Sequence, residues 1–391
     1  MTFNCPNDVR QKPRILIGVT SDQTCLVLRG RLSALRVAGF EVIILSSPGD
    51  NLNRVAIEEG VTARAVAMRR GISPIQDLVS LIAICRILWQ IRPTITDFST
   101  PKAGLLGNLA AWGMRVPRRV YTLRGLKLEG LQGGKRRLLL WSERVAAWCA
   151  HEVVCNSKSL RSAAKSLSVA PGKKLRLFGD GSSNGVDTVR FSPGVSDVRE
   201  EWGISEDDLV LGFVGRLTED KGIPELLIAF EKILKAEPRA RLLLVGWFDR
   251  AEDALDLRWR VHISSHPRIC HTGFMQVTTP YYRAMDVLVL PTHREGFPNV
   301  ALEAAACGIP VITTDCTGAR DAVIHNVTGL LIPFGSPDSI TGAALELFGN
   351  VEKRLEFGQA GRAWVTERYT KERVLGLAVE FFRELSAGFQ G

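Results

Sequence analysis

Apolar and polar positions along the first half of the chain predict alternating strands and helices. A short apolar run at 14–19 is followed by helical spacing at 28–39, which ends at Gly39, and by a second apolar run at 40–47. Strand, helix and strand within about 35 residues make a βαβ unit, which predicts a parallel sheet. The alternation continues through a stretch at 94–100, helices at 75–91, 103–112 and 134–149, and strands at 118–123 and 152–157.

The second half of the chain repeats this pattern. The apolar run at 209–217 predicts a strand, 223–238 a helix, and 240–247 another strand. Between the halves, residues 177–194 are rich in Gly, Ser and Pro, which is typical of a hinge or linker. We therefore expect an α/β protein with two Rossmann-like, doubly wound domains that face a cleft, with ligands bound outside the carboxyl ends of the strands.

The length of the chain agrees with two domains, because 391 residues exceed the size at which one hydrophobic core keeps growing. We place the first domain at 1–190 and the second at 191–374, and we expect a C-terminal helix at about 375–391 to pack back on the first. Hydrophobic residues make up 46% of the chain and charged residues 23%, which is ordinary for a soluble globular protein.

Charge is divided unequally between the halves. Residues 1–190 hold 29 Lys and Arg against 13 Asp and Glu, a balance of +16, while the whole chain carries +9, so the remainder carries −7. A basic half favours an anionic partner: nucleic acid, a membrane surface or a phosphate-bearing substrate. The alternative is a scatter of solvated arginines. Nucleic acid is the weaker candidate, because no recognition motif accompanies the charge.

Cysteines and histidines give no sign of a disulfide frame or a metal site. The eight cysteines lie far apart without a C-x-x-C pair, and no H-E-x-x-H spacing occurs. We expect reduced core thiols, a cytoplasmic protein without a secretory signal, and no metal or other cofactor. The apolar stretch at 78–91 is about 14 residues long and carries Arg86, so we expect it not to span a bilayer and any membrane contact to be peripheral.

Candidate chemistry appears first around residues 295–308. Pro298 suits the start of a helix and Gly308 its end, which predicts a helix at about 298–306. The first amides of a helix lack an internal acceptor and lie at the positive end of its dipole. We therefore expect the backbone near Phe297, Pro298, Asn299 and Val300 to bind a phosphate.

Two carboxylates flank this predicted phosphate site. Glu303 lies one turn into the helix and leans toward its N-terminus, and Glu295 lies in the turn that precedes it. Carboxylates accept hydrogen bonds from hydroxyl pairs, which suits Glu303 to a ribose and Glu295 to a second group of hydroxyls. The alternative is that both are ordinary residues of a solvated helix and a turn.

Cations that complement a diphosphate occur in the first βα turn of the second half, at 212–223. Gly215 ends the strand, and Arg216 and Lys221 lie on the short loop before the next helix. Arg binds a diphosphate bidentately and Lys binds it as a point charge. The glycine spacing matches neither the dinucleotide fingerprint nor the Walker A sequence.

Segments 215–230 and 294–333 resemble the donor-binding domain of GT-B fold retaining glycosyltransferases of family 4, with an E-x7-E motif at Glu295 and Glu303. Segments 99–112, 121–130 and 181–187 extend the resemblance to the bacterial polysaccharide branch of this family and to nearly the whole chain. The resemblance implies that Arg216 and Lys221 hold the diphosphate of a nucleotide sugar, most commonly UDP-linked, with Glu303 on the ribose and Glu295 on the donor sugar.

The first domain departs from the family pattern at two places. Arg124 stands where many members have a histidine beside the donor sugar, and the segment Asp97 to Ser99 replaces a histidine-containing one. Arg124 is suited to be a fixed positive charge but not a base, because a guanidinium does not deprotonate in proteins. We expect Asp97 and Lys102 on the acceptor side, or Asp97 as no more than a strand-end residue.

A basic helix at 133–150 is the predicted membrane contact. Lys135, Arg136, Arg137 and Arg144 lie beside leucines and tryptophans, as in helices that lie in a membrane interface. The alternative is that the helix packs Leu139, Val145 and Trp148 into the domain and leaves its cations solvated.

Together these features predict a retaining, metal-independent glycosyltransferase with an acceptor-binding first domain and a donor-binding second domain. Its substrates would be a nucleotide sugar and a glycan acceptor, expected to be lipid-linked, in capsule or lipopolysaccharide biosynthesis. We expect it peripherally at the inner face of the plasma membrane, on an anionic surface. The alternatives are a nucleotide-sugar epimerase, which the spacing of Glu295 and Glu303 disfavours, and a silent binding module, which the added pair Arg216 and Lys221 disfavours.

Overall fold

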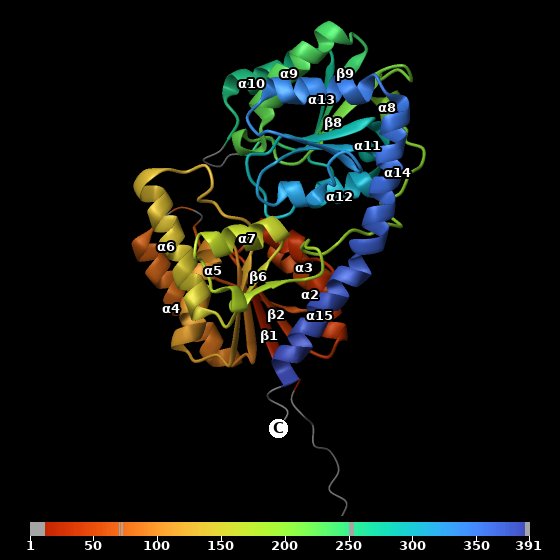
Figure 1. Ribbon diagram of the computed structural model, residues 1–391. Coiled ribbons are helices and arrows are strands. Elements are labelled where there is room, and N and C mark those ends of the chain that lie inside the picture. The colour runs from red at the N-terminus through yellow and green to blue at the C-terminus, as the bar shows by residue number, and fades with distance from the viewer. Residues whose placement is uncertain (1–11, 70, 72, 250–253, 388–391) are drawn as a thin grey trace, which may run out of the picture.

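The computed structural model describes residues 12–69, 71, 73–249 and 254–387. These residues form two parallel sheets, each with helices on both faces, and the two units are stacked with their helices and loops in contact (Figure 1). The predicted α/β fold with two doubly wound units is confirmed.

The first sheet has seven strands in the order β3-β2-β1-β4-β5-β6-β7. Its strands are β1 (Arg14–Gly18), β2 (Glu41–Ser46), β3 (Thr62–Ala65), β4 (Ile95–Ser99), β5 (Arg118–Leu123), β6 (Glu152–Cys155) and β7 (Leu175–Leu177). The helices between them are α1 (Asp22–Cys25), η1 (Leu26–Leu28), α2 (Arg31–Val37), α3 (Asp50–Glu59), α4 (Pro74–Ile91), α5 (Pro101–Gly113), α6 (Gly133–Cys149), α7 (Lys158–Ser166) and η2 (Gly172–Lys174).

The second sheet has six strands in the order β10-β9-β8-β11-β12-β13. Its strands are β8 (Leu209–Val214), β9 (Ala240–Val245), β10 (Ile269–Gly273), β11 (Val287–Leu290), β12 (Val311–Thr314) and β13 (Gly329–Ile332). The helices of this half of the chain are α8 (Val198–Glu201), η3 (Glu219–Lys221), α9 (Ile223–Ala236), α10 (Leu257–Ser265), α11 (Thr279–Ala284), α12 (Asn299–Ala306), η4 (Ala319–Ala322), α13 (Pro337–Phe348) and α14 (Val351–Arg368), followed by the last helix, α15 (Lys371–Ala387).

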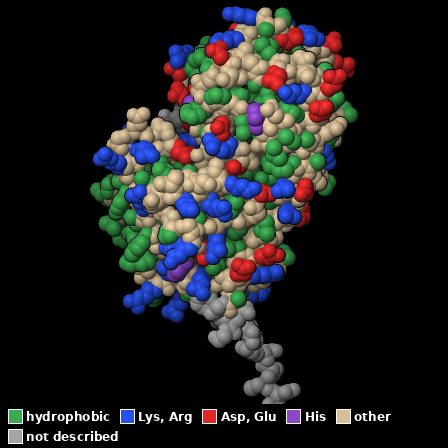
Figure 2. Space-filling model, viewed as in Figure 1, with side chains coloured by type: hydrophobic (Ala, Val, Ile, Leu, Met, Phe, Trp, Pro, Cys, Tyr) green, Lys and Arg blue, Asp and Glu red, His purple; other side chains and the backbone are tan. Residues whose placement is uncertain are grey.

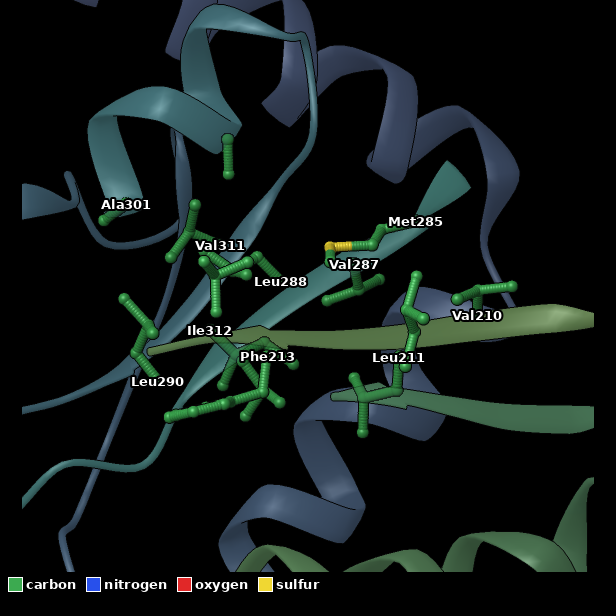
Figure 3. Close-up of a cluster of buried hydrophobic side chains, with 14 of the residues drawn as sticks. Val210, Leu211, Phe213, Met285, Val287, Leu288, Leu290, Ala301, Val311 and Ile312 are labelled. Atoms are coloured by element: carbon green, nitrogen blue, oxygen red, sulfur yellow. The ribbon is translucent and has the colours of Figure 1, made fainter. Parts of the chain in front are cut away.

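Alternation along the strands supplies a core on each face of the sheets. In β1, Ile15 and Ile17 pack with α2 and α3, while Leu16 packs on the opposite face with α4 and α5. In the second sheet, Phe213 of β8, Leu288 of β11 and Ile312 of β12 lie together in the buried cluster of Figure 3. Because both faces are covered, the strands read as continuous apolar runs.

The last helix returns to the first sheet. α14 lies along the second unit, and α15 runs down beside α2 (Figure 1). Ala378 and Phe382 of α15 belong to the same core as Ile15, and the ring of Phe381 lies 5.2 Å from that of Phe178. The C-terminus thus ties the two units together.

The chain order reverses beside the central strand of each sheet. In the second sheet the reversal falls between β8 and β11, and in the first between β1 and β4. The loops that leave such a pair of strands diverge to opposite faces and leave a crevice at the carboxyl ends, which is where ligands bind in open parallel sheets. The site is therefore expected from the topology at two crevices, one in each unit.

Candidate active site

The crevice of the second sheet brings Lys221 and Glu295 into contact. Lys221 ends η3, in the loop after β8, and Glu295 lies in the turn between β11 and α12; their side chains form an ion pair from Nζ to Oε1. The two residues are 74 positions apart in sequence. The structure therefore places the predicted diphosphate cation and the predicted sugar carboxylate side by side.

Gly222 permits this close approach of the two loops. Its φ of +72° lies in the left-handed region, and a Cβ there would lie 2.1 Å from the carbonyl oxygen of Pro291. Any side chain would push the loop after β8 away from the loop after β11. Gly215, at the end of β8, is held by its amide, which donates to the carbonyl of Val245 at 2.9 Å.

Further charges of the crevice are also paired. Arg216 Nη1 lies 2.6 Å from Asp249 Oδ2, on the loop after β9, and Arg294 Nη2 lies 3.1 Å from Asp220 Oδ2. Burial raises the pKa of Asp220, but the hydroxyl of Thr218 and the surrounding cations lower it overall. Asp220 is thus held ionised among cations. An arriving phosphate can replace a carboxylate in such an ion-paired arrangement.

α12 points its N-terminus at this crevice. It begins at Asn299, one residue after the predicted start, with Pro298 as the preceding cap and no side chain capping its amides. Asn299 Oδ1 accepts a hydrogen bond at 3.0 Å from Ser182, in the segment predicted as a hinge, and Val300 packs against the core. Phe297 is buried with its ring 5.5 Å from that of Tyr369.

Glu303 lies on α12 and is held by a tyrosine. The hydroxyl of Tyr282, on α11, donates to Glu303 Oε2 at 2.7 Å. Burial raises the pKa of Glu303, and this hydrogen bond and the nearby Arg190 partly offset the rise. The tyrosine fixes one carboxylate oxygen.

His293 has a defined partner that the sequence did not indicate. Its Nε2 lies 2.9 Å from Glu225 Oε1 on α9, and this hydrogen bond raises the pKa of His293. Sequence alone leaves His293 as either a contact to the donor or an ordinary turn histidine. The structure makes it a link between the turn after β11 and the first turn of α9.

Arg124 lies across the cleft, directly after β5. Its Nε donates to Ser99 and its Nη1 to Ser183, each at 3.1 Å. Burial first, and then the nearby Arg31, lower the pKa of Arg124 to about 10, against the opposing effect of Asp97. The side chain stays a cation at neutral pH and is held by hydroxyls rather than by a carboxylate.

The two units touch each other beside Arg124. A Cβ on Gly296 would lie 2.1 Å from the carbonyl oxygen of Arg124, so only glycine fits there. Thr317 donates to Glu129 at 2.7 Å, and Asp321 accepts from the amide and hydroxyl of Ser159 at 2.7 and 2.6 Å. These contacts set Arg124 opposite the turn that carries Glu295.

Comparison with known proteins gives the family. Residues 27–181 match the family model described as "Glycosyl transferase 4-like domain", and residues 208–350 match "Glycosyl transferases group 1". The capsular polysaccharide biosynthesis glycosyltransferase CapM of Staphylococcus aureus is 33% identical over 355 residues, covering 90% of this chain and 92% of CapM. The chain belongs to the group 1, family 4-like glycosyltransferases.

Two further similarities agree with this family. The UDP-Gal:alpha-D-GlcNAc-diphosphoundecaprenol alpha-1,3-galactosyltransferase of Escherichia coli is 28% identical and covers 71% of this chain and 72% of its own. HepE of Anabaena, solved in complex with UDP-glucose, matches with a TM-score of 0.78 at 18% identity, covering 95% of this chain and 99% of HepE. The second likeness concerns the fold alone, and confirms the GT-B arrangement.

The two predicted acceptor-side residues of the glycosyltransferase have different surroundings. Asp97, in the middle of β4, is 1% exposed and accepts a hydrogen bond from Thr122 at 2.6 Å. Lys102 forms an ion pair at 2.6 Å with Asp77 of α4, so its ammonium links α4 to α5. Asp97 is thus buried beneath the first crevice, and Lys102 is engaged at its edge.

The first crevice of the glycosyltransferase holds a buried cation that sequence reasoning missed. Arg31, the first residue of α2, is 2% exposed; its guanidinium lies over the rings of Phe178 and Phe382, and its Nε has no hydrogen-bond partner among the described residues. Burial lowers the pKa of Arg31, and the nearby Asp97 opposes this effect. An arginine at a helix start reads as solvated in sequence, so no local signal identified it.

Backbone strain marks the same crevice. Thr100 has a φ of +71°, which is rare for a β-branched residue, and its hydroxyl lies 2.6 Å from that of Thr20 after β1.

Among the described residues, no group of three or more His, Cys, Asp and Glu is placed to hold a metal ion. The seven cysteines within residues 12–387 that the structure describes are free thiols.

Proposed function

We propose that this glycosyltransferase moves a sugar, with retention of its configuration, from a UDP-linked donor to a lipid-linked glycan acceptor in surface polysaccharide biosynthesis. The observation that carries the proposal is the juxtaposition of Lys221 and Glu295 at the crevice between β8 and β11, with the uncapped start of α12 beside them. A cation, a carboxylate and free amides at one point suit a diphosphate that is linked to a sugar.

Each group has one role in this reaction. Arg216, Lys221 and the first amides of α12 hold the diphosphate, and they stabilise the negative charge that grows on it as the bond to the sugar breaks. Glu303 holds the ribose, with its carboxylate fixed by Tyr282. Glu295 holds the donor sugar hydroxyls.

The acceptor enters from the first unit. Its hydroxyl oxygen bonds to the anomeric carbon on the face from which the nucleoside diphosphate departs, which retains the configuration, and the hydroxyl proton passes to the departing phosphate oxygen. Arg124 adds a fixed positive charge opposite Glu295, because the backbone of Arg124 and Gly125 abuts the turn at Gly296. These cations neutralise the leaving group without a metal ion, so we propose metal-independent transfer without a cofactor.

Relatives support the choice of substrates and place. CapM carries capsular polysaccharide biosynthesis in its name, and the E. coli relative carries a UDP-sugar donor and a diphosphoundecaprenol-linked acceptor. A lipid-linked acceptor would hold the enzyme peripherally at the inner, anionic face of the plasma membrane. Family membership favours transfer over an epimerase or a silent binding module.

The test is release of nucleoside diphosphate from candidate sugar donors, with and without a lipid-linked glycan, in the presence of a chelator. If the protein is a retaining transferase, UDP release should depend on the acceptor. The anomeric configuration of the transferred sugar, measured by NMR of the product, should be the same as in the donor. A donor that binds without releasing UDP indicates a silent module, and formation of an epimeric sugar indicates an epimerase. Inverted configuration would refute retention, and loss of activity on chelation would refute metal independence.

A further inference from the structure

The outward face of α4 is apolar. Five large apolar side chains, between 48% and 83% exposed, follow one stripe at helical spacing: Ile75, Leu78, Val79, Ile82 and Trp89. The inward face of the same helix packs Ile84 and Leu88 into the core. A surface helix of a globular protein normally turns polar residues outward, so the second apolar face calls for a partner.

Composition alone would let α4 cross a membrane, and it is the only helix of the described residues of which this is true. The helix was predicted from sequence at 75–91, and it extends over 18 residues, Pro74–Ile91, so it is longer than its most apolar stretch at 78–91. Since Ile84 and Leu88 belong to the domain core, α4 cannot span a bilayer in this fold. It can only lie on one.

Tryptophans extend the apolar surface over the neighbouring helices. α4 packs against α5, and α5 packs against α6. The exposed tryptophans among the described residues all lie on these three helices: Trp89, Trp112, Trp141 and Trp148. Trp148 is exposed, with its ring 5.2 Å from that of Trp112, whereas one interpretation of the sequence placed it in the core. We call the outward sides of α4, α5 and α6 the α4–α6 face.

Charge on the α4–α6 face is of one sign. Residues 74–149 contain four acids, and each is turned inward: Asp77 pairs with Lys102, Asp97 and Glu143 are buried, and Glu129 bonds Thr317 across the cleft. The exposed charges in this stretch are cations, among them Arg86, Arg115, Lys135, Arg137 and Arg144. Figure 2 shows hydrophobic side chains interspersed with Lys and Arg along this flank.

We propose that the α4–α6 face docks on an anionic phospholipid bilayer, with the outer stripe of α4 and the tryptophans inserted at the interface. Apolar side chains bury themselves at the acyl boundary, tryptophan prefers the headgroup level, and the cations bind anionic headgroups. A second copy of the chain fits less well, because two such faces would bring cations against cations. The docking element is thus α4, with the basic helix α6, the contact predicted from sequence, as its electrostatic support.

The α4–α6 face ends at the cleft. α6 begins at Gly133, just after the segment in which Glu129 bonds the second unit and Arg124 lies opposite Glu295. This part rests on the proposed lipid-linked acceptor: its glycan would reach the cleft while its lipid stays in the bilayer. Docking itself needs no acceptor.

Flotation of the full-length protein with vesicles tests the proposal. Leu78→Glu/Ile82→Glu adds charge to two exposed positions of α4, and Leu257→Glu/Val261→Glu repeats the change at two exposed positions with the same spacing on α10. Vesicles of phosphatidylcholine with phosphatidylglycerol should recover the wild type and the α10 variant. Recovery of the α4 variant should fall by about tenfold or more, because two apolar side chains no longer insert.

Two further measurements make the outcome decisive. Phosphatidylcholine alone should recover less wild-type protein, and anionic vesicles should shift its tryptophan fluorescence to the blue. The α4 variant should still bind UDP like the wild type, so failure of docking and failure of the proposed transfer are separable. Three results would overturn the proposal. The first is equal flotation of the wild type and the α4 variant, and the second is an equal loss of flotation in the α4 and α10 variants. The third is a dimer that forms without lipid in the wild type and is absent only in the α4 variant.

Discussion

The two crevices of the molecule have the same topology and opposite charge arrangements. Between β8 and β11, the cations Lys221, Arg216 and Arg294 each lie against a carboxylate. Between β1 and β4, Arg31 and Arg124 share one nearby carboxylate, Asp97. The first arrangement can exchange carboxylates for phosphates at little cost, while the second keeps a fixed excess of positive charge.

The difference suits two halves of one transfer reaction. A donor diphosphate arrives and leaves in every cycle, so its site benefits from acids that replace it when it departs. A charge that only has to be present near the reacting sugar can be held permanently by hydroxyls, as Ser99 and Ser183 hold Arg124. The comparison yields five predictions, beginning with the largest expected effect.

Removing the ammonium of Lys221 from the crevice between β8 and β11, the proposed donor site, should have the largest effect. Lys221→Ala should lower kcat/KM. The loss should correspond to about 2 to 4 kcal/mol of transition-state stabilisation, which is the range for one preorganised electrostatic contact. Lys232→Ala, which removes a half-exposed lysine from α9, is the matched control and should keep wild-type kinetics. If Lys221→Ala kept wild-type turnover and UDP affinity, Lys221 would not be part of the diphosphate site.

Substitutions of the two glutamates in the crevice between β8 and β11 should affect different quantities: one should lower kcat, and the other should weaken nucleotide binding. Glu295→Gln should lower kcat by about tenfold or more and leave UDP affinity nearly intact, since it loses a contact to the reacting sugar. Glu303→Gln should weaken binding of both UDP and the full donor, because the ribose changes little in the reaction. Calorimetry with UDP and kinetics with the donor measure both; the reverse result would exchange the two roles.

Tyr282→Phe sharpens this prediction without touching a charge. It removes the hydroxyl that fixes Glu303 Oε2, so it should weaken UDP binding in the same direction as Glu303→Gln but less. An effect on kcat with unchanged UDP affinity would contradict the assignment of Tyr282 as a positioning residue for Glu303.

The fixed cation of the first unit should act on turnover alone. Arg124→Met should lower kcat by about tenfold and leave UDP affinity within twofold, because it removes a charge at the sugar rather than at the nucleotide. Arg124→Lys keeps the charge but loses the fork that bonds Ser99 and Ser183, and should be intermediate. If Arg124→Met lost UDP affinity to the same extent as kcat, Arg124 would contact the nucleotide. The two crevices would then not differ in the way that we propose.

The crevice between β8 and β11, the proposed donor site, was more predictable from sequence than the crevice between β1 and β4. β5 has the predicted bounds, α9 begins at the predicted Ile223, and α12 begins one residue later than predicted. Apolar runs, a proline and a glycine are local signals, and chain order alone brings the loops after β8 and β11 together.

Long-range packing explains what the sequence did not reveal. Arg31 is buried by Phe382, which comes from the far end of the chain, and Glu129 meets Thr317 only because the two units dock. The outer stripe of α4 was hidden for a different reason: apolar residues on both faces of a helix resemble a buried helix until its neighbours are known.

Buried carboxylates give the comparison its last test, through pH. Asp220 and Glu225 of the second unit have lowered pKa values. Glu143 of α6 is 2% exposed and accepts a hydrogen bond from Tyr121; burial raises its pKa to about 7, although that hydrogen bond lowers it in part. The first two groups stabilise the fold when ionised, whereas Glu143 stabilises it when protonated.

Glu143→Gln should therefore remove a loss of stability that the wild type suffers as pH rises. Protonated Glu143 contributes fully below the ordinary glutamate pKa, and the contribution is lost as pH rises through its folded pKa of about 7. A neutral glutamine still accepts from Tyr121, so above pH 7 the variant should melt about 2 to 8 °C higher than the wild type, with no gain near pH 4. Melting curves across this range measure the effect, with the exposed Glu58→Gln as a control that should shift by no more than about 1 °C. A constant difference between variant and wild type at every pH would mean that the pKa of Glu143 is the same in the folded and the unfolded protein, and that its burial acts through packing alone.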